Sequence, residues 1–216
     1  MAAIEPKLGL RERKKRRTRE TIVAVATRLF VEQGYEATTT AQIADAAEVS
    51  SSTFFKYFPT KADVVFSLFD ALIESADRRL RERHDGEAAS EALVAWIEQD
   101  LPEVEATYVE LLHESDRLMV SDPELQAQSR LRSARFEDVL AAAFAQDLGE
   151  SADGVRPRVL AAIAWRGMLD VWAAWHETHA SDEQEDIKEI CTVKADYVRR
   201  ALAAGLEAVE LLRRPS

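Results

Sequence analysis

Few residues in this sequence break helices, and nothing in it favours strands. The 216 residues include only 7 glycines and 6 prolines, and no run alternates apolar and polar residues with the period of two that strands show. No stretch of about 18 uncharged apolar residues occurs, so no membrane-spanning helix is expected. The fold class is therefore expected to be all-α, and the 47 % apolar residues suffice for a real core.

Cysteine is nearly absent, which limits cross-linking and metal chemistry. Cys191 is the only cysteine, so an internal disulfide is excluded and a reducing, cytoplasmic location is expected. The His and Cys spacings do not match a zinc finger, and neither a metal nor a cofactor is expected. The first residues carry charge from Glu5 onward and lack the apolar segment of a signal peptide.

Negative charge dominates the whole chain but not its beginning. The net charge of −11 argues against nucleic-acid binding when taken alone. Residues 1–61, however, hold 11 Lys and Arg against 7 Asp and Glu, a net charge of +4, which leaves −15 for residues 62–216. This asymmetry is typical of a basic DNA-binding module on an acidic body, although composition alone equally fits a solvated basic tail over residues 11–19.

Apolar periodicity divides the chain into about nine helices. The first is expected from Thr18 to Gln33, with Gly34 as a left-handed C-terminal cap. Thr39 with Gln42, and Thr60 with Asp63, have the spacing of capping boxes that open helices. The remaining helices are expected at 40–47, 51–58, 61–84, 88–100, 103–118, 123–147, 156–179 and 183–212.

The two short helices at 40–47 and 51–58 have the size and order of a DNA-binding helix-turn-helix. In that motif the second helix enters the major groove, where small hydroxyls allow close approach and Thr or Phe can contact a thymine methyl. Free N–H groups at helix starts near Thr40, Ser51 and Lys61 suit phosphates. The residues expected on the outward face are Ser51, Ser52, Thr53, Phe55, Lys56 and Tyr57.

Residues 34–44, 49–50 and 53–61 together resemble the DNA-binding signature of the TetR (tetracycline repressor) family. The resemblance covers about residues 13–65, with the helix-turn-helix at about 38–58. It implies a tail over 1–12 and a ligand-sensing, dimerising domain over 66–216. It also implies that residues 51–56 read bases, and that the phosphate contacts come from Thr39, Tyr57, Lys61 and, from an N-terminal arm, Arg16 and Arg17.

Two positions depart from that family's pattern. Glu48 stands where the turn usually has glycine, and a left-handed backbone at a non-glycine residue costs roughly 1–2 kcal/mol. Phe55 stands where tyrosine is common, so any contact there is apolar. A reshaped or slightly strained turn is therefore expected, within an otherwise intact motif.

Two long helices near the C-terminus are expected to form the dimer interface. The helix at 156–179 is apolar around nearly its whole circumference, so it must be buried on more than one side. The helix at 183–212 carries a stripe with small residues such as Ala204 and Gly205 that permit close approach. The resemblance implies a four-helix homodimer interface, while the residues alone also fit an intramolecular core. Arg166 and Asp170 are interpreted as a surface or interface ion pair rather than a ligand clamp.

The body also offers side chains for an effector site. As a set they favour a small apolar or aromatic effector, although each alone is more typical of ordinary core. The candidate ligand-binding residues are Trp96, Tyr108, His113, Met119, Phe136, Trp165, Met168 and Trp172.

The motif predicts a non-enzymatic protein that binds double-stranded DNA, and the resemblance implies a ligand-released repressor that binds a palindromic operator as a dimer. An architectural DNA-binding protein without a sensor is the first alternative, although such proteins are usually small and basic. A helical-bundle metalloenzyme is the second: Glu110 and His113 form half of a di-iron motif whose second copy is missing. The run over residues 11–19 has almost no apolar face, so no membrane partner is expected.

Overall fold

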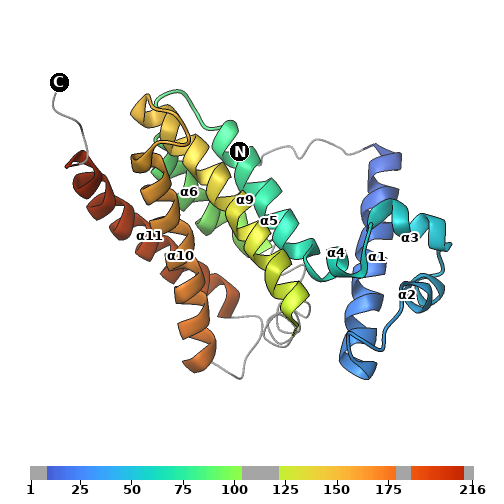
Figure 1. The fold of residues 1–216 in the computed structure, drawn as a ribbon. Coiled ribbons are helices and arrows are strands. Elements are labelled where there is room, and N and C mark those ends of the chain that lie inside the picture. Colours follow the sequence, from blue (N-terminus) through green and yellow to red (C-terminus); the bar gives the residue numbers. More distant parts are fainter. Residues whose placement is uncertain (1–8, 104–121, 179–185, 212–216) are drawn as a thin grey trace. The chain divides into compact units, whose positions relative to one another are not determined.

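The computed structural model describes residues 9–103, 122–178 and 186–211, and every regular element within these ranges is a helix (Figure 1). The chain divides into two compact units, one formed by residues 1–67 with 110–125 and the other by 68–109 with 126–216. None of the described helices is long and apolar enough to cross a membrane. The all-helical prediction is confirmed, while the helix expected at 103–118 lies almost wholly outside the described residues.

The first unit contains α1 (Leu10–Gln33), α2 (Thr40–Ala46), α3 (Ser51–Tyr57) and α4 (Lys61–Val65), with α2 and α3 beside α1 (Figure 1). Apolar residues at helical spacing on each element meet in one buried core, because short helices are stable only when packed. Its fully buried members include Ile22, Ala26, Phe30, Ile43, Ala44, Phe54, Phe58 and Val64.

Helix α1 corrects two expectations. It begins at Leu10 rather than Thr18, so the basic run over residues 11–19 is helical and not a tail. Gly34 has a φ of 88° but a ψ of 153°, so it ends the helix in an extended conformation and not in the left-handed helical one. Its N–H donates to Phe30 O at 3.0 Å. This positive φ still favours glycine.

The single helix expected from 61 to 84 is wrong, because the chain breaks at Phe66 into α4 and α5 (Ser67–Arg81). Phe66 has a φ of −88° and a ψ of 7°, and the buried Ser67 hydroxyl donates to Val64 O at 2.7 Å. A serine hydroxyl that bonds a carbonyl in the preceding turn favours a bend in the helix. The boundary between the two units falls at this break.

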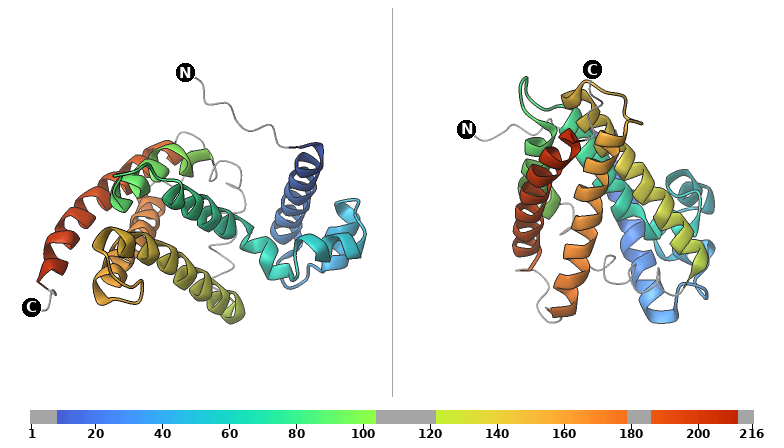
Figure 2. Two further views of the ribbon diagram at one scale, coloured as in Figure 1. Left: turned by 90° about the horizontal axis from the view of Figure 1, so that it is seen from above. Right: turned by 60° about the vertical axis from the view of Figure 1, so that its left-hand side comes forward.

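The second unit contains α5, α6 (Ala89–Gln99), α10 (Val155–Thr178), α11 (Asp186–Glu210) and most of α9 (Pro123–Leu148), whose first residues belong to the first unit. Helix α11 packs along both α10 and α6 (Figure 2). Two glycines permit this approach: a Cβ added to Gly167 would lie 1.9 Å from Tyr197 Cε1, and one added to Gly205 would lie 3.1 Å from Ile163 Cδ1.

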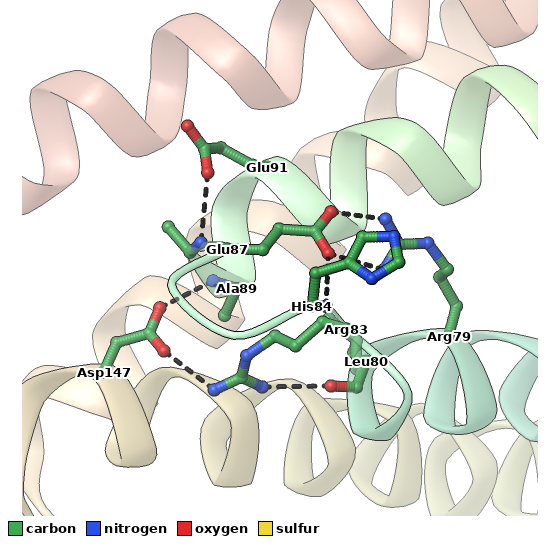
Figure 3. A network of polar contacts seen from close by, with 9 residues as sticks. Arg79, Leu80, Arg83, His84, Glu87, Ala89, Glu91 and Asp147 are labelled. Atoms are coloured by element: carbon green, nitrogen blue, oxygen red, sulfur yellow. Dashed lines mark hydrogen bonds and ion pairs between the residues drawn. The ribbon is translucent and has the colours of Figure 1, made fainter.

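A polar network ties the loop between α5 and α6 to the end of α9 (Figure 3). Arg83 Nη2 donates to Asp147 Oδ1 at 2.8 Å, and the other Asp147 oxygen accepts from the backbone N–H of Ala89 at 2.6 Å. Arg79 donates to both oxygens of Glu87. Backbone and side-chain polar groups in this loop are thereby paired, which fixes one end of the bundle.

Candidate DNA-binding and effector sites

Both predicted capping boxes are confirmed. Thr39 Oγ1 accepts from the backbone N–H of Gln42 at 3.2 Å, and Gln42 Oε1 accepts from the backbone N–H of Thr39 at 2.8 Å. Thr60 and Asp63 make the same reciprocal pair at the start of α4. These bonds fix the entry into α2 and α4, and therefore the orientation of the helix-turn-helix.

The turn between α2 and α3 is a Schellman motif with glutamate at its left-handed position. Val49 N donates to Ala44 O at 2.9 Å, Glu48 N donates to Asp45 O at 3.1 Å, and Glu48 has a φ of 55°. The side chain of Glu48 is exposed and does not relieve the backbone conformation. The turn therefore keeps the geometry that glycine favours, and the expected strain lies at Glu48.

Helix α3 presents a continuous polar and aromatic face. Ser51, Ser52, Phe55 and Lys56 are exposed, with half of the Phe55 side chain accessible, while Phe54 is buried beneath them. The partly buried members of the predicted outward set are Thr53 and Tyr57.

The hydroxyls at the start of α3 form a cluster around its cap. Ser50 Oγ accepts from the backbone N–H of Thr53 at 3.1 Å and lies 2.8 Å from the Thr53 hydroxyl and 2.9 Å from the Ser52 hydroxyl. Each hydroxyl has both a donor and two acceptor lone pairs, so the cluster retains capacity for an external partner.

Lys61 is held against the loop between α1 and α2. Its Nζ donates to Tyr35 O at 2.5 Å and to Thr38 O at 3.1 Å, and it lies 3.9 Å from the centroid of the Tyr35 ring. An ammonium has three N–H donors, so one remains after these two bonds. Lys61 is half-buried, and its expected contact with a phosphate has to use that remaining donor.

The Tyr35 hydroxyl stays neutral throughout the physiological pH range. Burial of the ring raises the pKa of Tyr35 to about 12, and the carboxylates of Asp122 and Glu124 reinforce the shift. The ring lies 5.2 Å from that of Phe30, which joins the loop to the core of the unit.

The arginines expected on an N-terminal arm lie on α1 instead. Arg16 and Arg17 are exposed there, and Arg16 Nε lies 3.6 Å from Glu20 Oε1. The arm is therefore replaced by one helical surface. The Arg19 guanidinium lies 4.8 Å from the centroid of the Phe58 ring, a cation–π contact that packs α1 on the residue after α3.

The sequence prediction missed the support of this site by Tyr35 and Thr38. Their bonds to Lys61 span 26 and 23 residues, so no local spacing rule identifies them. The available signal is the position of both residues in the loop between α1 and α2, where carbonyls lie outside the hydrogen-bond ladder of a helix.

In the second unit, four of the candidate effector residues share one buried core: Trp96, Phe136, Trp165 and Met168. The Phe136 ring lies 6.0 Å from that of Trp96 and 4.7 Å from that of Trp165, and the Phe69 ring lies 5.4 Å from that of Trp165. The Trp96 indole N–H donates to Ser75 Oγ at 3.0 Å. These residues form the aromatic cluster of Phe69, Trp96, Phe136 and Trp165.

The other candidate effector residues are not in this cluster. Trp172 is half-buried on the same helix as Trp165, and the Lys194 ammonium lies 4.4 Å from the centroid of its ring. Tyr108, His113 and Met119 lie outside the described residues, as does Glu110 of the half motif for a metal. No group of three possible metal ligands occurs among the residues that the structure describes.

One face of α11 remains exposed. Val193, Tyr197, Ala204 and Ala208 are exposed on α11, whereas Gly205 from the same predicted stripe is buried against α10 of its own chain. The stripe therefore serves partly as intramolecular core. On α10, Arg166 and Asp170 form an exposed ion pair at 2.8 Å, as the surface interpretation predicts.

Helix α3 is exposed on a small helical core whose helices are capped, and a bundle of long helices with an aromatic interior follows it in the chain. These features define a helix-turn-helix DNA-binding regulator. Residues 22–68 match the family model for bacterial regulatory proteins of the tetR family, and residues 86–203 match the model of the MftR C-terminal domain. The chain belongs to the TetR family. It is a DNA-binding, ligand-responsive transcriptional regulator.

The relatives include transcriptional regulators of similar length. TcmR of Streptomyces glaucescens is 37 % identical over 72 % of this chain and 71 % of its own length. The mycofactocin biosynthesis regulator MftR of Mycobacterium tuberculosis is 27 % identical over 90 % of this chain and 94 % of its own. Among solved structures, a SmeT–triclosan complex has a TM-score of 0.59 and 21 % identity over 87 % of this chain and 91 % of SmeT, the repressor of a Stenotrophomonas maltophilia efflux pump.

Proposed function

We propose that the protein is a ligand-released repressor that binds an inverted-repeat operator as a homodimer. The observation that carries this proposal is the exposed face of α3, whose serines, Phe55 and Lys56 stand on a fully packed core. Side chains of this kind suit the edges and thymine methyls of the major groove. Since its target is chromosomal DNA, we place the protein in the cytoplasm.

The DNA contacts divide into two chemical groups. Ser51, Ser52, Thr53, Phe55 and Lys56 on α3 face bases. The phosphate-binding set surrounds them on α1, α2 and α4 and at the end of α3, and consists of Arg16, Arg17, Thr39, Thr40, Tyr57 and Lys61. Phosphate contacts position the protein, whereas base contacts select the sequence.

The exposed stripe on α11 is the dimer face in this proposal, together with the exposed side of α10. Val193 is 41 % exposed and Tyr197 is 37 % exposed, which is costly for apolar side chains in a monomer. Two copies of one short reading helix are also needed for adequate affinity and specificity.

The interface is tested by placing charge inside it. The double variant V193E/A204E should be monomeric in analytical ultracentrifugation and should lose operator binding, because four carboxylates would face one another across the two-fold axis. Lys188→Glu, an exposed change on the flank of α11, is the matched control and should remain dimeric. A dimeric double variant would place the interface elsewhere.

The effector is proposed to be a small apolar or aromatic molecule that binds in the second unit. SmeT has been solved in complex with triclosan, and the aromatic cluster provides apolar surface of the kind that such a ligand requires. Binding of effector and DNA must be reciprocally coupled, so that DNA weakens effector binding by the same factor.

Genomic footprinting with the purified protein tests the whole proposal. It should protect inverted repeats whose half-sites lie about 34–36 Å apart, or a multiple of that distance, and the effector should remove the protection. Uniform protection of random DNA that no small molecule relieves would instead favour an architectural protein.

A further inference from the structure

Trp165 buries an indole N–H donor that no acceptor among the described residues satisfies. Its side chain is only 6 % exposed, and its indole Nε1 has no hydrogen-bond partner among the residues that the structure describes. Leaving such an N–H buried without an acceptor is unfavourable, because the donor loses its hydrogen bonds to water, and buried tryptophans normally find a partner. Phenylalanine would fill the same apolar core without that cost, so the unpaired donor requires an explanation.

Trp96 shows that this core can satisfy an indole. Its side chain is 1 % exposed, and its Nε1 donates to Ser75 Oγ at 3.0 Å. Both tryptophan rings contact the same Phe136, so the two indoles belong to one cluster and differ in whether the protein supplies an acceptor. Of these two indoles, only that of Trp165 lacks an acceptor among the described residues.

The surroundings of Trp165 are apolar. Phe69 and Phe136 contact its ring edge to face, at interplanar angles of 81° and 89°. Met168 lies three residues further on the same face of α10 and is also buried. In such surroundings a charged ligand group pays a large desolvation cost, whereas a neutral acceptor pays little and gains a hydrogen bond.

We propose that the indole N–H of Trp165 is a polar recognition element of the effector site, and that the effector is a neutral aromatic molecule with a carbonyl oxygen that accepts this hydrogen bond. The proposal rests on the proposed function, in which the second unit senses an apolar effector. It adds the chemical group that the effector must carry. Since a neutral hydrogen bond contributes about 1–1.5 kcal/mol net, an analogue without the oxygen should bind roughly tenfold more weakly.

Two matched pairs of compounds test the acceptor directly. Benzophenone and diphenylmethane share one skeleton, as do 9-fluorenone and fluorene, and within each pair only the ketone has the oxygen. Calorimetric titration should show that the wild-type dimer prefers at least one ketone over its hydrocarbon by roughly tenfold. Trp165→Phe should bind both members of that pair with equal affinity. Failure of both ketones to bind, an absent preference, or a preference that survives in Trp165→Phe would overturn the proposal.

The indole N–H resonances provide a second readout, because the chain has only 4 tryptophans. In ¹⁵N-labelled protein, the signal that Trp165→Phe removes belongs to Trp165, and the ketone should move it downfield. The Trp96 signal is the internal control and should not move, since its donor is already bonded to Ser75. An unchanged Trp96 signal in Trp165→Phe also shows that the variant retains the core.

The outcome for this proposal is separable from that for the proposed function. If the wild-type protein protects an inverted repeat but the Trp165 signal does not respond to a bound ketone, the acceptor hypothesis is wrong and the regulator remains. Absence of operator protection contradicts the proposed function itself, whatever the ketones do.

Discussion

Different interactions stabilise the interior of each of the two units. In the first unit, α2, α3 and α4 have seven residues or fewer, and each begins at a Thr or Ser whose side chain accepts from the backbone. In the second unit, α9, α10 and α11 have 24 to 26 residues, and α11 packs along both α10 and α6. Isolated short helices are marginal in water, so the first unit depends on local caps and one small core, whereas the second depends on long-range packing.

The two units also differ in where the proposed DNA-binding and effector-binding side chains lie. The proposed base contacts of Ser51, Ser52, Phe55 and Lys56 are exposed side chains on a packed support, so they can be changed without unfolding the unit. The proposed effector contact is a buried indole within the core itself. Recognition and stability are therefore separable on the exposed face of α3, whereas they are coupled at Lys61, which also bonds the loop between α1 and α2, and at Trp165 in the second unit.

The largest expected effect comes from opening the small core beneath the reading helix. Phe54→Ala should destabilise the first unit by about 3–5 kcal/mol, because Phe54 is fully buried and its neighbours cannot close the cavity. For so small a unit that is most of its stability. DNA binding should be lost while the dimer persists, as measured by footprinting and sedimentation.

The adjacent Phe55 is the control for that change. It is 50 % exposed, so Phe55→Ala should alter stability by less than about 0.5 kcal/mol and weaken only operator binding. Equal destabilisation by both variants in chemical unfolding would show that recognition and stability are not separable in this unit.

The second prediction concerns the hydrogen bonds by which Lys61 holds the loop between α1 and α2. Lys61→Met keeps the apolar stem but removes two charged hydrogen bonds to Tyr35 and Thr38, which should cost about 1.5–3 kcal/mol in chemical unfolding. If the remaining donor also binds a phosphate, affinity for all sequences should fall and the salt slope should decrease by about one ion.

Lys56 is the matched lysine for that experiment, since it is exposed on α3. Lys56→Met should weaken binding with almost no change in stability. A change in base preference caused by Lys61→Met would contradict its assignment to phosphate.

Local chemistry explains what the sequence could predict. The capping boxes at Thr39 and Thr60 are set by spacings of three residues, and the short helices that they open follow directly. The outward face of α3 followed from the size and order of the two short helices, and the family resemblance added the assignment of its residues to bases and phosphates. The aromatic cluster was partly predictable because large apolar residues at helical spacing have to be buried.

Non-local contacts explain what the sequence could not predict. The break at Phe66 is an exception, because the accompanying bond from the Ser67 hydroxyl to Val64 O spans only three residues; it was missed because the apolar pattern does not register hydroxyl groups. The hydrogen bonds of Lys61 to Tyr35 and Thr38 join residues more than 20 positions apart. The unpaired indole N–H of Trp165 can be recognised only once the neighbouring side chains are placed. Apolar periodicity likewise could not separate the buried Gly205 from the exposed residues of the same stripe on α11.

A third prediction uses one backbone motif that occurs in both units. Glu48 and Gly149 both have positive φ, and in both turns the next N–H donates to a carbonyl five residues back. Glu48→Gly should therefore stabilise the first unit by about 0.5–1 kcal/mol. Gly149→Ala should destabilise the second by about 1 kcal/mol, although an added Cβ there would meet no neighbour.

Thermal unfolding of the three variants Glu48→Gly, Glu48→Gln and Gly149→Ala measures these conformational terms. Glu48→Gln retains the Cβ and removes only the charge, so it should leave the unfolding temperature nearly unchanged. A gain from Glu48→Gln equal to that from Glu48→Gly would assign the effect to charge and not to the backbone.

The smallest expected effect lies at the polar network of the second unit (Figure 3). The hydrogen bond from Arg79 lowers the pKa of Glu87, while burial opposes that shift and the backbone N–H of His84 supports it. A depressed folded-state pKa stabilises the protein above the unfolded value of 4.5, and this contribution disappears as the pH falls through the folded value. Glu87→Gln should thus be less stable than wild type near neutral pH, by less than about 1 kcal/mol, and should converge with it in acid.

Glu74→Gln, an exposed change on α5, should show no such convergence. A stability gap at Glu87 that persists unchanged in acid well below its depressed folded pKa would mean that the carboxylate charge contributes nothing to this network, and that shape alone holds the loop.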